Sequence, residues 1–179
     1  DLAFIERLCA ELGIHYHFQH SSEGHLLVFG DDQTVFAQAD RPTPYEAGSG
    51  MVADTPTIKR FAVQLATRTT AVNLRDYDWR KPHIEMESAV RVERLPRLEE
   101  QVYPGHFSDR THGKYLAQRG LERQRSDYRL AHGNGDEPAL SSGRFLKLTG
   151  HPRQGWNDLW LVRQVTHEGR QPQVLEEVV

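Results

Sequence analysis

The stretch Leu2–Gly30, LAFIERLCAELGIHYHFQHSSEGHLLVFG, carries the patterns that decide how the fold begins. Its first part places apolar residues at helical spacing as far as Leu12, and Gly13 follows as a helix stop. From Ile14 the pattern changes to the alternation of a strand, SSEG forms a turn, and HLLVFG returns. The stretch therefore predicts a helix followed by a β-hairpin.

Strand patterns dominate the rest of the chain. The clearest alternation is IEMESAVRVE at 84–93, which is typical of a half-exposed antiparallel strand. One polar helix is predicted over 111–131, with Ala117, Leu121 and Tyr128 as its narrow apolar stripe. The predicted strands are 58–65, 69–79, 84–93, 144–149, 158–167 and 173–179.

The segment 38–56 is rich in Gly, Pro, Ser, Thr and Ala without a period, which predicts a long loop. Two helices and several strands without βαβ alternation favour an α+β, mainly β fold. A small antiparallel β-barrel or sandwich is the expected architecture, with the helix at 111–131 on its periphery.

Composition limits the classes of function. The chain has 179 residues and a net charge of -3, so no overall basic field attracts nucleic acid. Cys9 is the single cysteine, which excludes an internal disulfide and a zinc site built from cysteines. The sequence begins in mid-helix without a methionine, carries no pattern of a signal peptide, and is expected to be part of a longer polypeptide.

The densest cluster of charges is VNLRDYDWRKP, Val72–Pro82. Asp76 and Asp78 stand two residues apart, so on a strand they share a face at roughly 6–7 Å. That distance suits the paired carboxylates of a glycoside hydrolase, and the alternative function is therefore a divergent metal- or carboxylate-dependent hydrolase domain.

A structural interpretation of the same cluster competes with catalysis. The apolar face of the strand switches between Leu74 and Tyr77, and Pro82 holds the chain extended. Such a switch predicts a bend near Arg75–Asp76, where the strand leaves the sheet. Arg75 and Arg80 are then expected to pair with the aspartates.

The hairpin holds four histidines. His15 and His17 share one strand face, and His20 and His25 stand near the turn. A His-x-His pair can bind zinc or copper when a third ligand is present. The competing interpretation is an exposed polar face opposite Ile14, Tyr16 and Phe18.

Other functional motifs are weak. The helix at 111–131 carries five basic residues interleaved with acids and no aromatic ladder, which favours a solvated or subunit-contacting surface over nucleic-acid binding. A binding module would need an exposed aromatic platform, and Trp79, Trp156 and Trp160 are the only tryptophans. Motifs of a nucleophile elbow and of a phosphate loop are absent from the sequence.

Five segments, taken in order, carry a family resemblance: DLAFIERLCAELGIHYHFQH, HLLVFGDD, NLRDYDWRKP, EQVYPGHFSDRTHGKYLAQRGLE and FLKLTGHPRQGWNDLWLVRQVTHEG. In this order they resemble the hub region of the valine-glycine repeat (VgrG) spike proteins of bacterial type VI secretion systems. That region is similar to the central hub of contractile phage tails. The resemblance covers about Asp1 to Gly169.

The resemblance implies a phage tail hub-like fold of small β-barrels. Residues 1–56 would form a helix plus β-hairpin element and a long loop, and 57–179 the second tube-type β-barrel with an inserted helix at about 111–131. In the family a first barrel precedes the position of Asp1, and an oligonucleotide-binding-like domain and a spike follow that of Val179.

The resemblance also implies a structural function without catalytic, cofactor-binding or metal-binding residues. The full-length parent would form a homotrimer, dock on the hexameric tube protein (Hcp), carry effectors through regions outside this chain, and puncture target membranes. It would be made in the cytoplasm and leave without a signal peptide, through the type VI apparatus, to the extracellular space or a target cell.

Overall fold

The computed structural model of the protein describes residues 1–47 and 55–170. In this part of the chain β-strands dominate and two α-helices are present, which confirms the prediction of a mainly β fold with two helices. Neither helix is long and apolar enough to cross a membrane in the described ranges. Two compact units share the chain: unit 1 comprises Asp1–Tyr16, Leu26–Gln33 and Ala62–His132, and unit 2 comprises His17–His25, Thr34–Phe61 and the chain from Gly133 onward.

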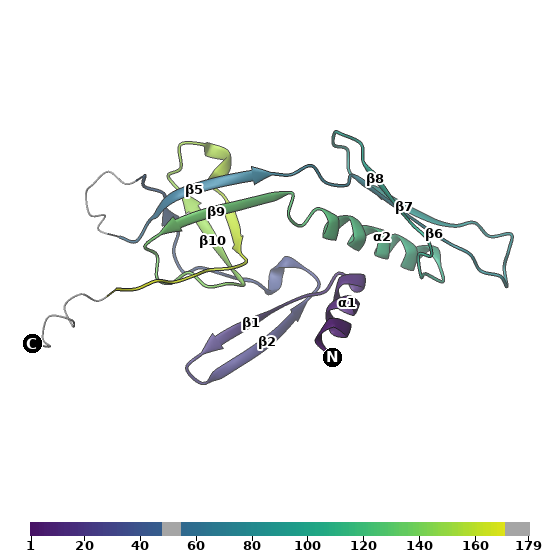
Figure 1. Cartoon of the computed structure of the whole chain (residues 1–179), viewed down its shortest axis with the longest axis horizontal. Coiled ribbons are helices and arrows are strands. Elements are labelled where there is room, and N and C mark those ends of the chain that lie inside the picture. The colour runs from purple at the N-terminus through teal and green to yellow at the C-terminus, as the bar shows by residue number, and fades with distance from the viewer. Residues whose placement is uncertain (48–54, 171–179) are drawn as a thin grey trace, which may run out of the picture. The chain divides into compact units, whose positions relative to one another are not determined.

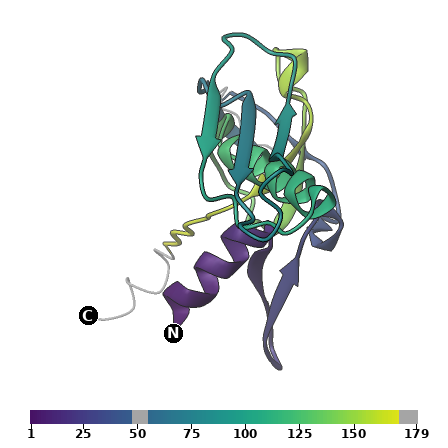
Figure 2. The ribbon, with the colours of Figure 1, turned by 90° about the vertical axis from the view of Figure 1, so that its right-hand side faces the viewer.

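A three-stranded sheet covered by α2 (Arg110–Gln124) forms the core of unit 1 (Figures 1 and 2). β6 (Ala71–Asp76) lies in the middle, antiparallel to β7 (Met86–Arg91) and parallel to β8 (Glu99–Val102). Successive side chains of a strand point to opposite faces, so every second residue of β6 faces α2. The buried cluster comprises Val72, Leu74, Phe107, Ala117 and Leu121.

Helix α2 begins where Asp109 caps it. The Asp109 carboxylate accepts a hydrogen bond from the His112 backbone N–H at 2.9 Å, which satisfies one of the free donors of the first turn. Ala117 and Leu121 are buried, as the predicted apolar stripe requires. Tyr128, the third residue of that stripe, lies beyond the end of the helix.

The prediction that the helix continues to residue 131 is wrong. Helix α2 ends at Gln124, and Arg129–Gly135 form strand β9, which pairs with β5 (Ile58–Leu65). The glycines of HGNGD, which indicate a turn, belong to this strand. Gly133 allows close contact with β5, because a Cβ there would lie 3.0 Å from the Arg60 carbonyl oxygen.

The predicted helix and hairpin at the start of the chain are confirmed. α1 spans Leu2–Leu12 and ends at Gly13, whose φ of 69° is the left-handed conformation that glycine adopts without strain. The strands β1 (His15–Ser21) and β2 (Gly24–Gly30) form a two-stranded sheet. A turn of two residues, Ser22 and Glu23, connects them.

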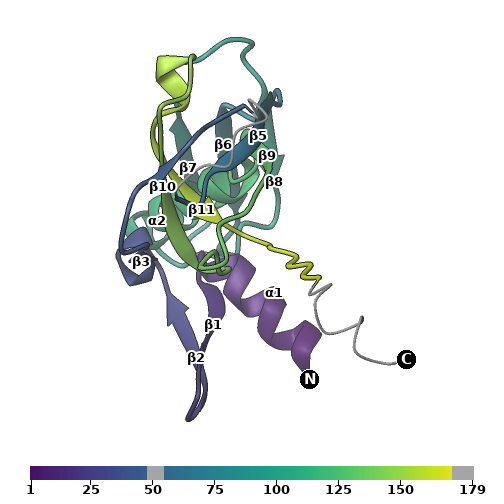
Figure 3. The same ribbon diagram turned by 90° about the vertical axis from the view of Figure 1, so that its left-hand side faces the viewer.

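Strand β10 (Arg144–Thr149) organises unit 2. It pairs antiparallel with β11 (Leu159–Val162), and the two run side by side in Figure 3. On its other side β3 (Ala37–Gln38) and β4 (Thr43–Pro44) pair with it in parallel. The core of unit 2 comprises Ile58, Leu146 and Leu148 with the half-buried Tyr45, Phe61, Leu140, Trp160 and Val162.

Several predicted boundaries differ from the structure. The loop prediction for 38–56 misses the end of β3 and all of β4, whose two-residue pairings with β10 leave no periodic pattern. The strand β8 was not predicted, and the strands predicted at 69–79 and 158–167 are shorter than expected. The strand predicted at 173–179, and the part of the loop at 48–54, lie outside the described residues.

Candidate interaction surfaces and side-chain clusters

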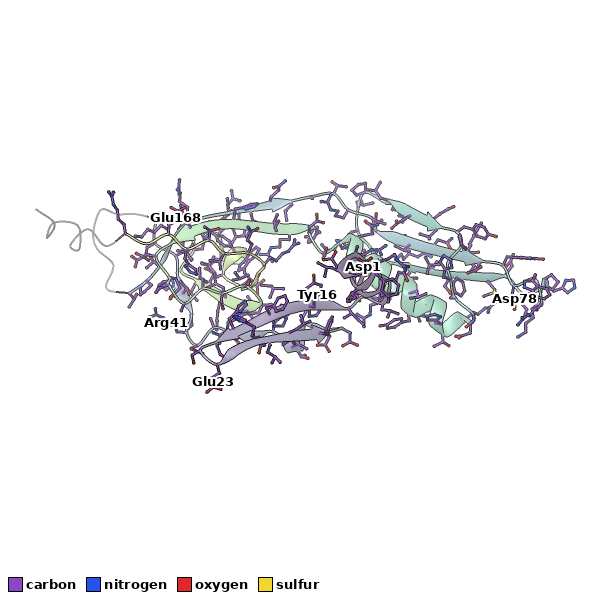
Figure 4. All side chains as sticks on the ribbon, turned by 60° about the horizontal axis from the view of Figure 1, so that its bottom comes forward. Asp1, Tyr16, Glu23, Arg41, Asp78 and Glu168 are labelled. Carbon is purple, nitrogen blue, oxygen red and sulfur yellow. The ribbon has the colours of Figure 1, made fainter. Side chains whose placement is uncertain are left out.

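The aspartates of VNLRDYDWRKP lie where β6 ends. Asp76 is the last residue of β6, and its carboxylate accepts a hydrogen bond from the Tyr77 backbone N–H at 2.7 Å. Asp78 accepts from the Arg80 backbone N–H at 2.9 Å and lies in the loop beyond the sheet (Figure 4). The predicted strand exit is therefore present. Each carboxylate supports the local turn of the backbone, which does not favour the hydrolase alternative.

The arginines of this stretch have other partners than expected. The prediction that they pair with the two aspartates is wrong: the guanidinium of Arg75 bonds both carboxylate oxygens of Glu87, at 3.3 and 3.4 Å, and Arg80 lies over the ring of Trp79 at 5.1 Å. Glu87 stands directly opposite Arg75 in the antiparallel register of β6 and β7. Cross-strand neighbours of opposite charge are the expected partners in such a sheet.

Glu87 also binds an amide. Asn73, which is buried, donates from Nδ2 to Glu87 Oε1 at 2.7 Å. This hydrogen bond, followed by the one from Arg75, lowers the pKa of Glu87 below its ordinary value. The charged carboxylate of Glu87 in β7 thus bonds two polar side chains of β6, Asn73 and Arg75, and links the polar faces of the two strands.

The tryptophans do not share one platform. Trp79 is 74% exposed in the loop after β6. In unit 2, Trp156 and Trp160 both pack around Phe61, with ring centroids 5.9 and 5.0 Å from it. The ring of His151, which is buried, lies 4.6 Å from that of Trp156. These two tryptophans therefore belong to the packing of unit 2.

The hairpin histidines are arranged differently from the His-x-His interpretation. His17 packs on Phe36 at 4.9 Å between ring centroids, so it is part of the packing in unit 2. His20 and His25 face each other across the two strands, with their Nδ1 atoms 2.7 Å apart. No group of three or more His, Cys, Asp or Glu side chains that could hold a metal lies in ranges 1–47 and 55–170. The contact between His20 and His25 was not predicted from the sequence, although a two-residue turn places these residues opposite each other.

Helix α1 exposes most of its apolar side. In unit 1 it lies against α2, where Tyr115 and Arg123 donate hydrogen bonds to the carbonyl oxygens of Leu12 and Ala10. Its single buried side chain is that of Cys9. The exposed apolar residues are Leu2 at 62%, Phe4 at 53%, Ile5 at 43%, Leu8 at 37% and Leu12 at 41%. These exposed side chains make the apolar side of α1 a candidate interaction surface.

Unit 2 has a hollow of about 210 Å³ whose lining combines charged side chains, such as Arg41 and Glu137, with the uncharged Ala39, Thr43, Ala139 and Leu140. Arg41, labelled in Figure 4, donates to both oxygens of the buried Glu137 at 3.1 and 3.4 Å. The Ala139 backbone N–H also bonds this carboxylate, at 3.2 Å. Glu137 thus has its hydrogen-bond partners within unit 2, which indicates a structural ion pair in this hollow.

The basic residues predicted for one helix surface have separate structural partners. Arg119 pairs with Glu122 at 2.7 Å, and the hydrogen bond to Glu122 raises the pKa of Arg119 above its ordinary value. Arg125 donates to the Thr69 carbonyl oxygen at 3.1 Å. Arg129, expected on the helix, lies in β9. These side chains hold unit 1 together and do not form one basic stripe.

Comparison with known proteins identifies the class of protein. Residues 1–173 match the phage tail baseplate hub (GPD) family, and the chain belongs to it. It is 57% identical over 183 residues to the type VI secretion system spike protein VgrG4b of Pseudomonas aeruginosa, covering 100% of this chain and 23% of the relative. The resemblance inferred from the five segments is therefore confirmed.

Two further relatives agree. The spike protein VgrG5 of Pseudomonas aeruginosa is 54% identical over 182 residues, covering 100% of this chain and 23% of the relative. The spike protein VgrG3 of Vibrio cholerae is 34% identical over 185 residues, covering 99% and 18%. The chain thus spans less than a quarter of the length of these relatives.

Proposed function

We propose that this chain is a structural hub segment of a type VI secretion spike and catalyses no reaction. The observation that carries the proposal is similarity to spike proteins along the whole chain, at up to 57% identity among the relatives described above. The engagement of Asp76 and Asp78 by backbone N–H groups supports a structural use of the one stretch that resembled an active site.

The full-length parent forms a homotrimer in this proposal, and the apolar side of α1 contributes to the contact between subunits. Phe4, Ile5 and Leu8 are each more than a third exposed, and Leu26 and Phe29 of β2 add apolar surface to unit 1. Burying such surface stabilises association by roughly 25 cal/mol per Å². A subunit contact explains why a helix of this amphipathic pattern leaves its apolar side open.

The tube-type barrel predicted for 57–179 remains part of the proposal, as does the division at residue 56. The described strands form four small sheets with short edge strands such as β7 and β8. Edge strands offer unpaired backbone groups to further strands. Segments of the parent, or neighbouring subunits, would complete the barrel along these edges.

In its parent the hub docks on the hexameric tube protein, and effectors are carried by regions outside this chain. The spike punctures the target membrane when the secretion apparatus contracts. It leaves the producing cell through this apparatus, without a signal peptide. The relatives VgrG4b and VgrG5 are type VI secretion system spike proteins, which supports a place for this chain in a spike; docking, effector transport and membrane puncture are our extension of that place.

The mass of the full-length parent in solution tests the trimer. We expect three copies at micromolar concentration, and fewer for the variant Ile5→Lys, because a charge would be buried in the contact. Ala3→Lys is the matched control: it places the same charge on the same helix at a residue outside the apolar side. A parent that is a stable monomer, or a trimer that Ile5→Lys and Ala3→Lys weaken equally, would contradict the proposal.

A further inference from the structure

Two arginines of unit 1 lie against one tyrosine just beyond the end of α2. The guanidinium carbon of Arg94 is 5.0 Å from the ring centroid of Tyr128, and that of Arg125 is 4.9 Å from it. Arg97 is exposed in the same connection between β7 and β8 as Arg94. Within residues 1–47 and 55–170, none of the three arginines forms an ion pair with a carboxylate. We propose that this arginine patch, Arg94, Arg97 and Arg125 beside Tyr128, binds an acidic segment of another protein.

The positive charges of the arginine patch favour an anionic ligand. Because Arg94 and Arg125 contact the same ring, their guanidinium carbons are no more than about 10 Å apart, which is close to the Debye length in ~0.1 M salt. The two cations therefore repel each other. Arg125 cannot turn away freely, since it donates a hydrogen bond to the Thr69 carbonyl oxygen at 3.1 Å. Carboxylates bound at the patch would offset the repulsion, and their two oxygens match the fork of a guanidinium.

The connection that carries Arg94 and Arg97 is anchored at both ends. The Thr70 carbonyl oxygen accepts a hydrogen bond from the Val92 backbone N–H at 2.9 Å. The Thr70 hydroxyl oxygen accepts one from the Leu98 backbone N–H at 2.9 Å, and the Thr70 backbone N–H donates to the Leu98 carbonyl oxygen at 2.8 Å. Thr70 is itself buried. A connection fixed in this way loses less conformational freedom on binding, which favours the bound state.

Apolar side chains next to the arginines favour a protein as the partner. Leu95 lies in the same connection and is 86% exposed, and Leu98 at its end is 42% exposed. A free phosphate or a nucleic acid would leave these leucines in water, and the exposed carboxylate of Glu93 would repel a dense polyanion. Arginine and tyrosine are also enriched in the contact surfaces of proteins. The patch therefore fits a segment in which acidic and apolar side chains alternate.

Fluorescence anisotropy of a fluorescein-labelled peptide of alternating glutamate and leucine, titrated with the whole chain, tests the surface. We expect saturable binding that weakens as salt is added, and much weaker binding of the same peptide with glutamine in place of glutamate. Arg94→Gln and Arg97→Gln should each weaken binding about threefold, and the double variant about tenfold, because single exposed ion pairs contribute little. Arg110→Gln, which changes another exposed arginine of unit 1, is the matched control and should leave binding unchanged.

Further arms distinguish a protein segment from other anions. Leu95→Asn should weaken binding of the glutamate–leucine peptide and leave any binding of inorganic pyrophosphate unchanged. A labelled oligothymidine that binds more tightly than the peptide would assign the patch to nucleic acid and overturn the proposal. The absence of saturable peptide binding would overturn it as well, as would binding that the double variant of Arg94 and Arg97 leaves unchanged. Circular dichroism of each variant checks that these exposed substitutions leave the fold intact.

Discussion

Two glycines of α2 should respond in opposite directions when each is replaced by alanine. A Cβ at Gly113 would lie 2.5 Å from Ser88 Oγ and 2.7 and 2.8 Å from two ring carbons of Phe107. A Cβ at Gly120 would meet Val72 Cγ1 at 3.6 Å, which is an ordinary van der Waals distance. Both variants make the same substitution in the same helix. The difference between their free energies of unfolding therefore measures how closely each site is packed.

The magnitudes follow from two opposing effects. Alanine in place of glycine in a helix interior raises the free energy of unfolding by up to about 1 kcal/mol, which is the expected result for Gly120→Ala. Gly113→Ala should raise the free energy of unfolding by the same amount through helix propensity. Against this, Phe107 is only 5% exposed, so it cannot move aside freely for the new methyl group. Overpacking of a core costs about 1–3 kcal/mol. We therefore expect a net loss of about 1 kcal/mol for Gly113→Ala, and a difference of about 2 kcal/mol between the variants.

Urea unfolding followed by helical circular dichroism measures both variants against the unchanged chain. The double variant Ser88→Ala with Gly113→Ala should recover part of the loss, because it removes the hydroxyl oxygen that the new methyl group meets. If Gly113→Ala proves as stable as Gly120→Ala, the close packing of α2 on the sheet and on Phe107 is refuted.

Further measurements test the second core and the polar face of the sheet. Leu148→Ala should lower the free energy of unfolding by about 2–5 kcal/mol because the side chain is 1% exposed, whereas Leu159→Ala, at a 46% exposed site, should change it by about 0.5 kcal/mol or less; equal losses would contradict the burial. The lowered pKa of Glu87 means that its contribution is fully present above its unfolded pKa, about 4.3, and disappears as the pH falls through the lower folded value. Stability relative to Glu87→Gln should therefore decline between pH 6 and pH 3, and a difference that does not change with pH would argue against the bonds from Asn73 and Arg75.

The elements predicted correctly are those whose signals are local. α1 could be predicted to end at Leu12 because Gly13 provides the left-handed conformation, and the hairpin followed from alternation around a short turn. The exit of β6 at Asp76 could be predicted from the switch of its apolar face. Each of these signals arises within a few residues, so the sequence is enough to find it.

The elements predicted wrongly depend on partners that are distant in the sequence. Gly135 illustrates this. A Cβ there would clash with the Thr57 carbonyl oxygen, so only glycine lets β9 lie this close to the backbone at Thr57. A glycine-rich turn and a glycine-rich strand have the same composition, and only the pairing distinguishes them. The His20–His25 pair was missed for a similar reason, because their proximity depends on the strand register.

The two units are not consecutive along the chain, and this affects how they can be separated. The polypeptide passes from one unit to the other five times, after residues 16, 25, 33, 61 and 132. Cutting one loop therefore releases neither unit, because covalent connections remain elsewhere. A force applied to one unit therefore reaches the other through several stretches of backbone. An interleaved path of this kind resists being pulled apart in a way that two domains joined by one linker do not.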